Sequence, residues 1–393
     1  MRDSRFLTVV VLGSTQTLAW ASSYYLPAII ADRIAGDTGV STNWLFGTFS
    51  ASLILSALLG PRVGRAIDRA GGNGVLAASS ALFATGLCLL AAAHSLALLV
   101  AAWIVLGVGM GLGLYDAAFA ALGRLYGMEA RKPITGITLI AGFASTIGWP
   151  LTAWGAATLG WRETCLLWAA VHLFVGLPLN YWMLPRPAAT AAGQPGKATA
   201  SEAVPLDRTM ILLAFAFSAV WIVSAGMAAH FPRILEAAGA SPTQAIAAGV
   251  LIGPAQVAAR LLEAGPLGRF HPLTTARLAC VTHPVGAAVI LAAGGGVAAS
   301  AFAVLHGSGN GILTIARGTV PLSLYGPANY GYRLGILGAP SRFLSAGAPL
   351  AFALLLDHLG AGVLVVSSLL SLSALLALCL IRRPTPHVVS HAS

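Results

Sequence analysis

Two arginines lie within or close to apolar stretches of the chain, where a permanent charge needs a partner or a ligand. Arg260 follows Gln256 by four residues, which is about one helical turn, and Arg342 lies about eight residues into another apolar stretch. A guanidinium group grips a carboxylate through two parallel hydrogen bonds and stays charged. We therefore expect Arg260 and Arg342 to bind a small anion, with Gln256 beside the first. A solvated position for Arg260 is the alternative, because Gly265 and a proline follow closely.

An acid and a third arginine occupy nearly equivalent places in two further apolar stretches. Asp116 lies past the middle of one, and Arg317 lies about 200 residues later in the other. Pairing lowers the cost of burying both charges, and a substrate or proton can split such a pair. We expect Asp116 and Arg317 to face each other across a binding cavity. The alternative for Arg317 is that its long side chain simply reaches the surface.

Uncharged side chains add to this candidate substrate site. Gln16, Trp20 and Tyr24 share one helical face, which would give a cavity wall an amide, an indole and a phenol. An interfacial aromatic belt is the alternative for Tyr24. His306 is a candidate proton carrier, although a hydrogen-bonded structural role is the simpler reading, and Asn310 could hydrogen-bond a polar ligand.

The composition indicates which elements must position these residues. The 393 residues are 57% hydrophobic and 9% charged, and the mean hydropathy is +0.83. These values exclude a soluble enzyme, a disordered chain and a nucleic-acid-binding module. Since a helix needs roughly 20 apolar residues to cross a bilayer, we predict an all-α membrane protein with twelve transmembrane helices, at residues 6–30, 42–59, 75–93, 96–122, 134–158, 164–184, 209–231, 244–262, 273–293, 297–319, 334–356 and 360–381.

The distribution of basic residues predicts the topology. With the N-terminus in the cytoplasm, only Arg33, Arg162 and Arg233 fall in segments on the opposite side, and Arg342 lies within a span. Because Lys and Arg favour cytoplasmic loops, we expect a multi-pass protein of the cell inner (plasma) membrane with both termini cytoplasmic. The first apolar stretch is too long for a cleavable signal peptide.

The chain divides into two similar halves. Residues 185–208 are rich in Pro, Ala, Gly and Thr and predict a flexible cytoplasmic linker. We expect residues 1–184 and 209–393 to form two pseudo-symmetric six-helix bundles. A glycine run repeats with an offset of 200 residues, at Gly107, Gly109 and Gly111 and again at Gly307, Gly309 and Gly311. Repeated halves are typical of transporters with a substrate site at the repeat interface.

The segment after the second predicted span carries a recognisable pattern of glycines and charges. It reads Gly60-Pro-Arg-Val-Gly64-Arg65-Ala-Ile-Asp68-Arg69-Ala-Gly71-Gly72. With the twelve spans and the central linker, it resembles the signature loop of the major facilitator superfamily. The resemblance covers the whole chain and implies two bundles that rock about a central cavity and expose it to each side in turn.

We expect this segment to latch one bundle to the other in a single state. Gly64 and Gly71 permit tight turns, and Asp68 can accept hydrogen bonds from helix N-terminal N–H groups or pair with an arginine. Gly60, Arg65 and Arg69 complete the predicted latch. The corresponding segment of the second half, which begins at Gly265, lacks the acid, so we expect a stronger latch in the first half.

A second resemblance points to one branch of the superfamily. The segment from Tyr126 through Arg131 and Lys132 to Gly142 is similar to the start of the fifth span in monocarboxylate and oxalate/formate transporters. Those transporters also place an acid four residues before a substrate-binding arginine in the eighth span. Here Gln256 replaces that acid before Arg260.

These patterns predict a secondary transporter that carries a small organic anion by proton symport or exchange. The alternative is proton-coupled efflux of a toxic small molecule, a drug or metalloid, with Asp116 as the key residue. We expect no enzyme activity, because the sequence has no clustered catalytic set, and no nucleotide, because it has no GxxxxGK[ST] loop. We also expect no cofactor, no metal and no nucleic-acid partner, and a chain that works as a monomer.

Overall fold

The computed structural model describes residues 2–185 and 204–382, and every regular element in these ranges is a helix. Most of the predicted linker, residues 186–203, lies outside the described residues. The helices before it form what we call the first group: α1 (Arg2–Ala19), α2 (Pro27–Thr38), α3 (Thr42–Ala70), α4 (Asn73–Ala91), α5 (Leu96–Gly113), α6 (Tyr115–Tyr126), α7 (Arg131–Ala141), α8 (Ala144–Thr158) and α9 (Trp161–Val171).

The helices after the linker form the second group. They are α10 (Arg208–Ala237), α11 (Pro242–Val250), α12 (Ile252–Ala264), α13 (Pro272–Ala293), α14 (Gly295–Tyr325), α15 (Tyr330–Leu359) and α16 (Val363–Cys379). Each group has its own apolar core. One cluster of buried side chains lies wholly within residues 19–169, and two lie within residues 210–381. A further cluster of the first group also takes in Leu322, Tyr330 and Leu334 of the second.

The helices are long and apolar enough for a membrane. Within the described residues, eight helical stretches could cross a bilayer by length and composition. Many large apolar side chains are exposed on the helices, including Phe174, Trp182 and Leu350. Lipid chains solvate such side chains as an apolar core does, and the backbone hydrogen bonds of the helices are satisfied internally. The protein is therefore a multi-pass membrane protein.

Several predicted spans are not continuous helices. The first changes to a π-helix over Trp20–Tyr24, so that the Tyr25 amide donates to the Trp20 carbonyl at 3.0 Å. The predicted span 96–122 breaks at Leu114, whose extended backbone ends α5 and begins α6. The predicted span 134–158 breaks after Ala141. Conversely, α3 does not stop near residue 59 but continues to Ala70.

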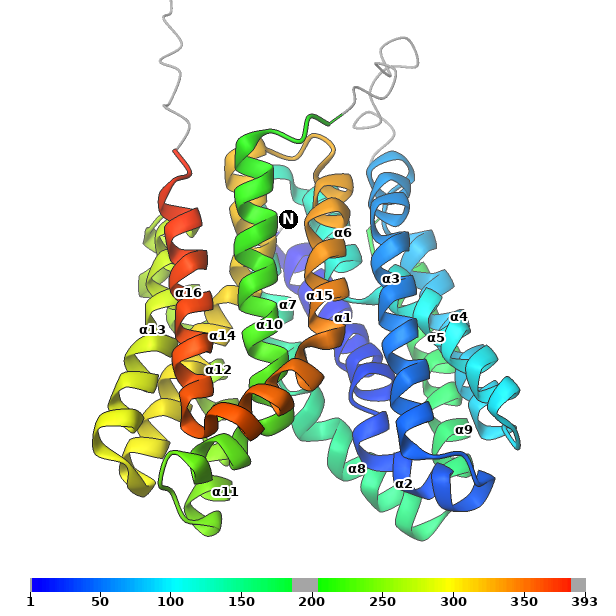
Figure 1. The fold of residues 1–393 in the computed structure, drawn as a ribbon. Helices are drawn as coiled ribbons and strands as arrows, with labels where there is room; N and C mark the ends of the chain where they lie inside the picture. The colour runs from blue at the N-terminus through cyan, green and yellow to red at the C-terminus, as the bar shows by residue number, and fades with distance from the viewer. Residues whose placement is uncertain (1, 186–203, 383–393) are drawn as a thin grey trace, which may run out of the picture.

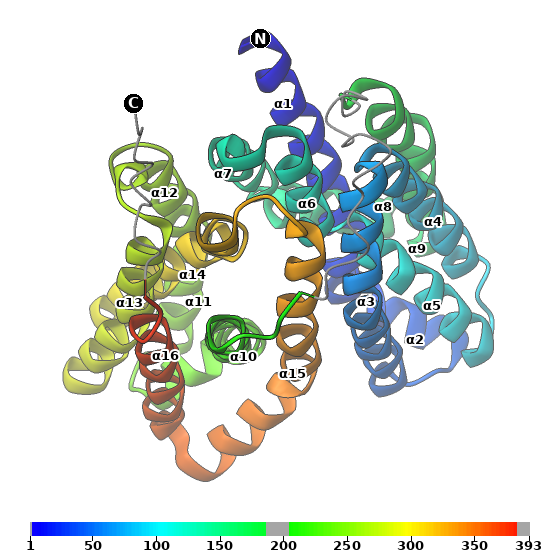
Figure 2. The same cartoon turned by 90° about the horizontal axis from the view of Figure 1, so that it is seen from above.

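The two groups meet towards one end of the molecule. Figure 1 shows the chain ends that flank the linker, together with the last described residues of α16, at its upper end, which we call the linker end. The main contacts between groups join α3 and α6 to α15, α7 to α12, and both α6 and α7 to α14. At the opposite end, α2 and α8 diverge from α11, and each packs within its own group. Viewed from the linker end, α15 lies beside α3 at the seam (Figure 2).

Candidate functional site

Asp116 is the acceptor of two arginines from the other group. The break at Leu114 places Asp116 in the first turn of α6, where the helix dipole favours a negative charge. Its Oδ2 atom accepts hydrogen bonds from Arg317 Nη2 at 2.7 Å and from Arg342 Nη2 at 2.5 Å. All three side chains are largely buried. The pairing of Asp116 with Arg317 predicted from the sequence is therefore confirmed, and Arg342 is a second partner that the sequence did not indicate.

This triad carries a net charge of about +1, because two guanidinium groups share one carboxylate. Arg342 also donates from Nη1 to the carbonyl and hydroxyl oxygens of Ser56, both at 3.2 Å. The Arg317 guanidinium lies 5.3 Å from the ring centre of Trp221. Gly338 leaves the space for the triad, since a Cβ atom there would lie 2.6 Å from Asp116 Oδ2. The Oδ1 atom of Asp116 is buried with no partner among the described residues.

Arg260 crosses between the groups at a second point. Its Nη1 atom donates to the carbonyl oxygen of Thr138 at 2.9 Å, near the C-terminal end of α7, and Nη2 contacts Gln256 Oε1 at 3.4 Å. The side chain is 4% exposed, which contradicts a solvated position. Gly142 is needed beside it, because a Cβ atom would lie 2.1 Å from Nη1. Its Nε atom has no partner among the described residues, so Arg260 keeps capacity for a ligand.

Aromatic rings of the first group cluster around Trp20, within electrostatic reach of Arg260. The ring centre of Trp20 is 5.1 Å from that of Tyr24 and 5.0 Å from that of Tyr115, and Tyr25 packs against Trp149 at 5.8 Å. Arg260 is close enough to the hydroxyl groups of Tyr25 and Tyr115 to act on them electrostatically. The indole Nε1 of Trp20 is buried and unpartnered within the described part of the chain. We call Trp20, Tyr24, Tyr25 and Tyr115 the aromatic wall.

Gln16 has a different role from the expected one. Its amide nitrogen donates to the Gly113 carbonyl at 2.5 Å, where the end of α5 leaves carbonyl groups without helical partners. The helix changes from α to π at Trp20, and the rings of Trp20 and Tyr24 stay in contact, with their centres 5.1 Å apart. Gln16 supports the break between α5 and α6, which in turn positions Asp116.

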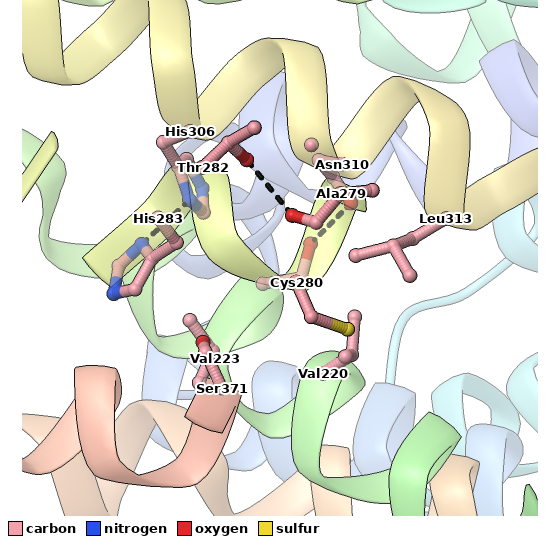
Figure 3. A pocket seen from close by; sticks show the side chains of 12 residues that line it. Val220, Val223, Ala279, Cys280, Thr282, His283, His306, Asn310, Leu313 and Ser371 are labelled. Carbon is pink, nitrogen blue, oxygen red and sulfur yellow. Dashed lines mark hydrogen bonds between the residues drawn. The ribbon is translucent and has the colours of Figure 1, made fainter. Parts of the chain in front are cut away.

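His306 and Asn310 lie apart from the triad, inside the second group. They line a small cavity between α10, α13, α14 and α16 (Figure 3). Asn310 Oδ1 accepts a hydrogen bond from Ser224 at 3.0 Å, and His306 is hydrogen-bonded to His283. The sequence grouped both residues with Arg260 and Asp116; the structure does not bring them together.

The segment predicted as a latch does join the groups. Asp68 Oδ1 and Oδ2 accept hydrogen bonds, both 2.8 Å long, from the backbone amides of Gly331 and Tyr332. These amides belong to the first turn of α15, so Asp68 caps a helix of the other group. The Arg65 guanidinium lies 4.2 Å from the ring centre of Tyr332. Arg69 is exposed at the end of α3.

Glycines allow α3 and α15 to cross closely at this latch. A Cβ atom on Gly64 would lie 2.0 Å from the Gly331 carbonyl oxygen, and one on Gly335 would lie 2.4 Å from the Gly60 carbonyl. Close backbone approach through small residues is typical of packing in membranes. Gly71 ends α3 with φ of 87°, as expected for a turn. Gly64 does not form a turn, because it lies inside α3.

A second latch joins α12 to α7. It was not predicted when the two halves of the sequence were compared. Glu263 Oε1 accepts a hydrogen bond from Arg131 Nη2 at 2.8 Å, and Arg131 also donates to the Phe270 carbonyl at 2.8 Å. Glu263 is 2% exposed. The segment that begins at Gly265 lacks an acid, as its sequence shows, but a latching acid, Glu263, lies two residues before it. The sequence did contain a signal for this latch, namely an acid three residues after Arg260.

The comparisons with known proteins agree with this architecture. A sequence model described as Major Facilitator Superfamily matches residues 11–303. No curated protein matches the chain in a sequence search. Among solved structures, the human organic anion transporter MFSD10 (TETRAN) aligns with a TM-score of 0.68 and 19% identity, over 95% of this chain and 99% of that one.

Two further structures show the same fold. The proton:xylose symporter XylE, bound to 6-bromo-6-deoxy-D-glucose, has a TM-score of 0.71 and 13% identity, over 95% of both chains. FucP in the outward conformation has a TM-score of 0.73 and 14% identity, over 96% of this chain and 99% of that one. The family match covers most of the chain and the fold agrees with it. The chain therefore belongs to the major facilitator superfamily of membrane transporters.

Proposed function

We propose that the chain carries a small organic anion, a carboxylate, by secondary active transport with proton symport or exchange. The observation that supports this most directly is the charge at the seam. Arg317 and Arg342 of the second group share the single carboxylate of Asp116, and Arg260 donates to the Thr138 carbonyl and to Gln256 without a carboxylate partner among the described residues. An incoming carboxylate would replace Asp116 as the partner of one arginine. The new ion pair would thus form as an existing one breaks. Arg260, whose Nε has no partner, is the first contact we assign to the anion.

The aromatic wall would hold the apolar part of the substrate. Trp20, Tyr25 and Tyr115 lie on the first group and Arg260 on the second, so a ligand between them contacts both groups. Four residues of this region, Gln16, Trp20, Asp116 and Arg260, each have one buried side-chain polar atom without a partner among the described residues. Buried polar groups are nearly always hydrogen-bonded, which supports a ligand or water in this region.

We further propose that the two groups are six-helix bundles, twelve spans in all, that expose the site to each side in turn. The linker end is assigned to the cytoplasm of an inner or plasma membrane, since Arg65, Arg69 and Arg131 lie there. The groups are joined at this end, so the described state would be closed to the cytoplasm. The chain would act as a monomer.

The proposal can be tested by ligand-induced stabilisation of the purified protein in detergent. We expect lactate, oxalate or benzoate to raise the melting temperature by mass action and this shift to disappear in Arg260→Gln. The matched control is Arg233→Gln, whose arginine pairs with Asp357 on an exposed surface; it should keep the shift. A full carboxylate response in Arg260→Gln and in Arg260→Gln/Arg342→Gln would overturn the anion site.

The aromatic wall also suits a second function, proton-coupled efflux of a toxic small molecule such as a drug or metalloid. Its rings could bind an uncharged or cationic compound next to Asp116. In that case cationic or neutral toxicants, and not carboxylates, would stabilise the protein. Asp116→Asn would then abolish the effect while Arg260→Gln would preserve it.

A further inference from the structure

Two histidines meet ring to ring in the core of the second group. His283 on α13 and His306 on α14 have a distance of 3.0 Å between their Nδ1 atoms and are 5% and 7% exposed. His283 Nε2 lies 2.9 Å from the Ser367 hydroxyl of α16. Figure 3 shows both rings at one end of the small cavity.

We assign the protons of the pair from the hydrogen bonds around it. The Ser367 hydroxyl lies 3.1 Å from the Leu364 carbonyl, and we assign it as the donor to that carbonyl and hence as the acceptor from His283 Nε2. The Nδ1 atom of a neutral His283 is then an acceptor, and His306 Nδ1 is the donor to it. This leaves the lone pair of His306 Nε2 with no hydrogen bond to any described residue. The neutral pair therefore has one vacant basic nitrogen.

The surroundings of the pair would admit a proton but offer no counter-charge. The cavity has room for roughly one or two water molecules and is lined by Thr282, Asn310 and Ser371 as well as both histidines. The only other titratable group that lines it is the Cys280 thiol of α13. The lining residues of α10 and α16 do not titrate. Further along α10, His230 is hydrogen-bonded to the Pro349 carbonyl at 2.8 Å.

Among the described residues, the remaining packed helices add no facing charge. Helix α11 contains no titratable residue, and α12 contacts α14 at Gly307 through Ile252, eight residues before Arg260. On α14 itself, the nearest charged residue is Arg317, eleven residues or about 16 Å from His306 along the helix.

The first group shows that this position does not require histidine. The 200-residue offset holds in the packing: Gly107 and Gly111 contact Ser52 and Ser56, and Gly307 and Gly311 contact Ile252 and Gln256. By the same offset in sequence, His283 and His306 correspond to Phe83 and Leu106, which are both fully buried. The contacts of α13 shift by about one residue, since a Cβ atom on Gly109 would meet Phe83 and one on Gly309 would meet Thr282. The first group thus has apolar side chains where the second group has the two histidines.

We propose that the His283–His306 pair is the proton-binding site of this transporter, an inference that rests on the proposed proton coupling. A hydronium ion in the cavity water transfers its proton to His306 Nε2, where an N–H bond forms as an O–H bond breaks, and leaves a neutral water molecule. The resulting imidazolium donates a stronger, charge-assisted hydrogen bond from Nδ1 to His283. It adds a positive charge to the group that carries the three arginines, and this charge favours anion binding. The proton and the anion would therefore be transported together in the same direction.

The test replaces the pair with the side chains that the first group uses, in the variant His283→Phe/His306→Leu. The protein is reconstituted in liposomes, and uptake of labelled lactate, oxalate and benzoate is measured in two ways. Counterflow exchanges internal for external substrate without net proton movement, whereas accumulation in liposomes with an alkaline interior depends on the proton gradient. We expect the variant to retain counterflow and to lose accumulation. His230→Gln, a histidine of the same group outside the cavity, should retain both.

Each other outcome is decisive. Accumulation by the variant at the wild-type level would overturn the proton site. Wild-type counterflow without gradient-driven accumulation would refute proton coupling itself, and with it this inference, while preserving the carboxylate site. If the double variant does not fold, His306→Gln takes its place, because its amide can donate to His283 but has no basic nitrogen. Accumulation by that variant would overturn the proposal equally.

Discussion

Arg342 on α15 reaches across the seam and donates a 2.5 Å hydrogen bond to Asp116 on α6. The same oxygen of Asp116 also accepts from Arg317. One carboxylate of the first group thus holds two helices of the second. This shared acceptor makes the seam sensitive to any change in the charge of Asp116.

Asp116→Asn should destabilise the protein markedly. It removes the only carboxylate that pairs with Arg317 and Arg342 among the described residues and leaves both charges buried. Loss of one partner of a buried ion pair costs about 3–5 kcal/mol. The fall in melting temperature measures the effect, and Asp357→Asn, which breaks an exposed pair, should cost far less. Equal stabilities of the two variants would contradict the role given to the triad.

Asp68→Asn should slow turnover more than it weakens substrate binding. The neutral amide caps the start of α15 less well than a carboxylate. The state joined at the linker end therefore loses about 1 kcal/mol of stabilisation. Exchange rates in liposomes and ligand-induced thermal shifts would separate the two effects. The control is Arg62→Gln, at an exposed residue of the same segment. A weakened affinity with an unchanged rate would argue against a latch.

Gly64→Ala should disfavour the described state because a Cβ atom has no room against the Gly331 backbone. We expect the linker end to open, as measured by the distance between one spin label on each group. Gly253→Ala is the matched control, since nothing lies within 4 Å of a Cβ atom there. An unchanged distance distribution in Gly64→Ala would mean that the close crossing of α3 and α15 is not needed for this state.

Glu263→Gln should weaken the second latch. Hydrogen bonds between charged groups contribute about 1.5–3 kcal/mol to stability. Because Arg131 is partly exposed, we expect the loss of stability to lie near the lower value. A double-mutant cycle with Arg131→Gln measures the coupling directly. Additive effects of the two substitutions on the melting temperature would show that the pair contributes nothing to the seam.

The sequence was informative wherever a residue's surroundings follow from its own segment. The depth of Asp116 and Arg317 in apolar stretches predicted their pairing, and the spacing around Asp68 predicted a helix-capping acid. The hydrogen bond of Gln16 to the Gly113 carbonyl was not predicted, because the two residues lie 97 positions apart in the chain. Glu263 was missed because its partner, Arg131, lies 132 residues away in the chain. The position of His306 beside His283 depended in the same way on how α13 packs against α14.

The three arginines at the seam are all anchored in α12, α14 and α15, so the packing of one group sets the distances between them. A carboxylate held by two of them would keep that grip in both orientations of the transporter. In the proposed cycle, it would change only its neighbours on the first group, Asp116 and the aromatic wall. Charge recognition and directional selectivity would thus reside in different halves of the chain and could be altered independently.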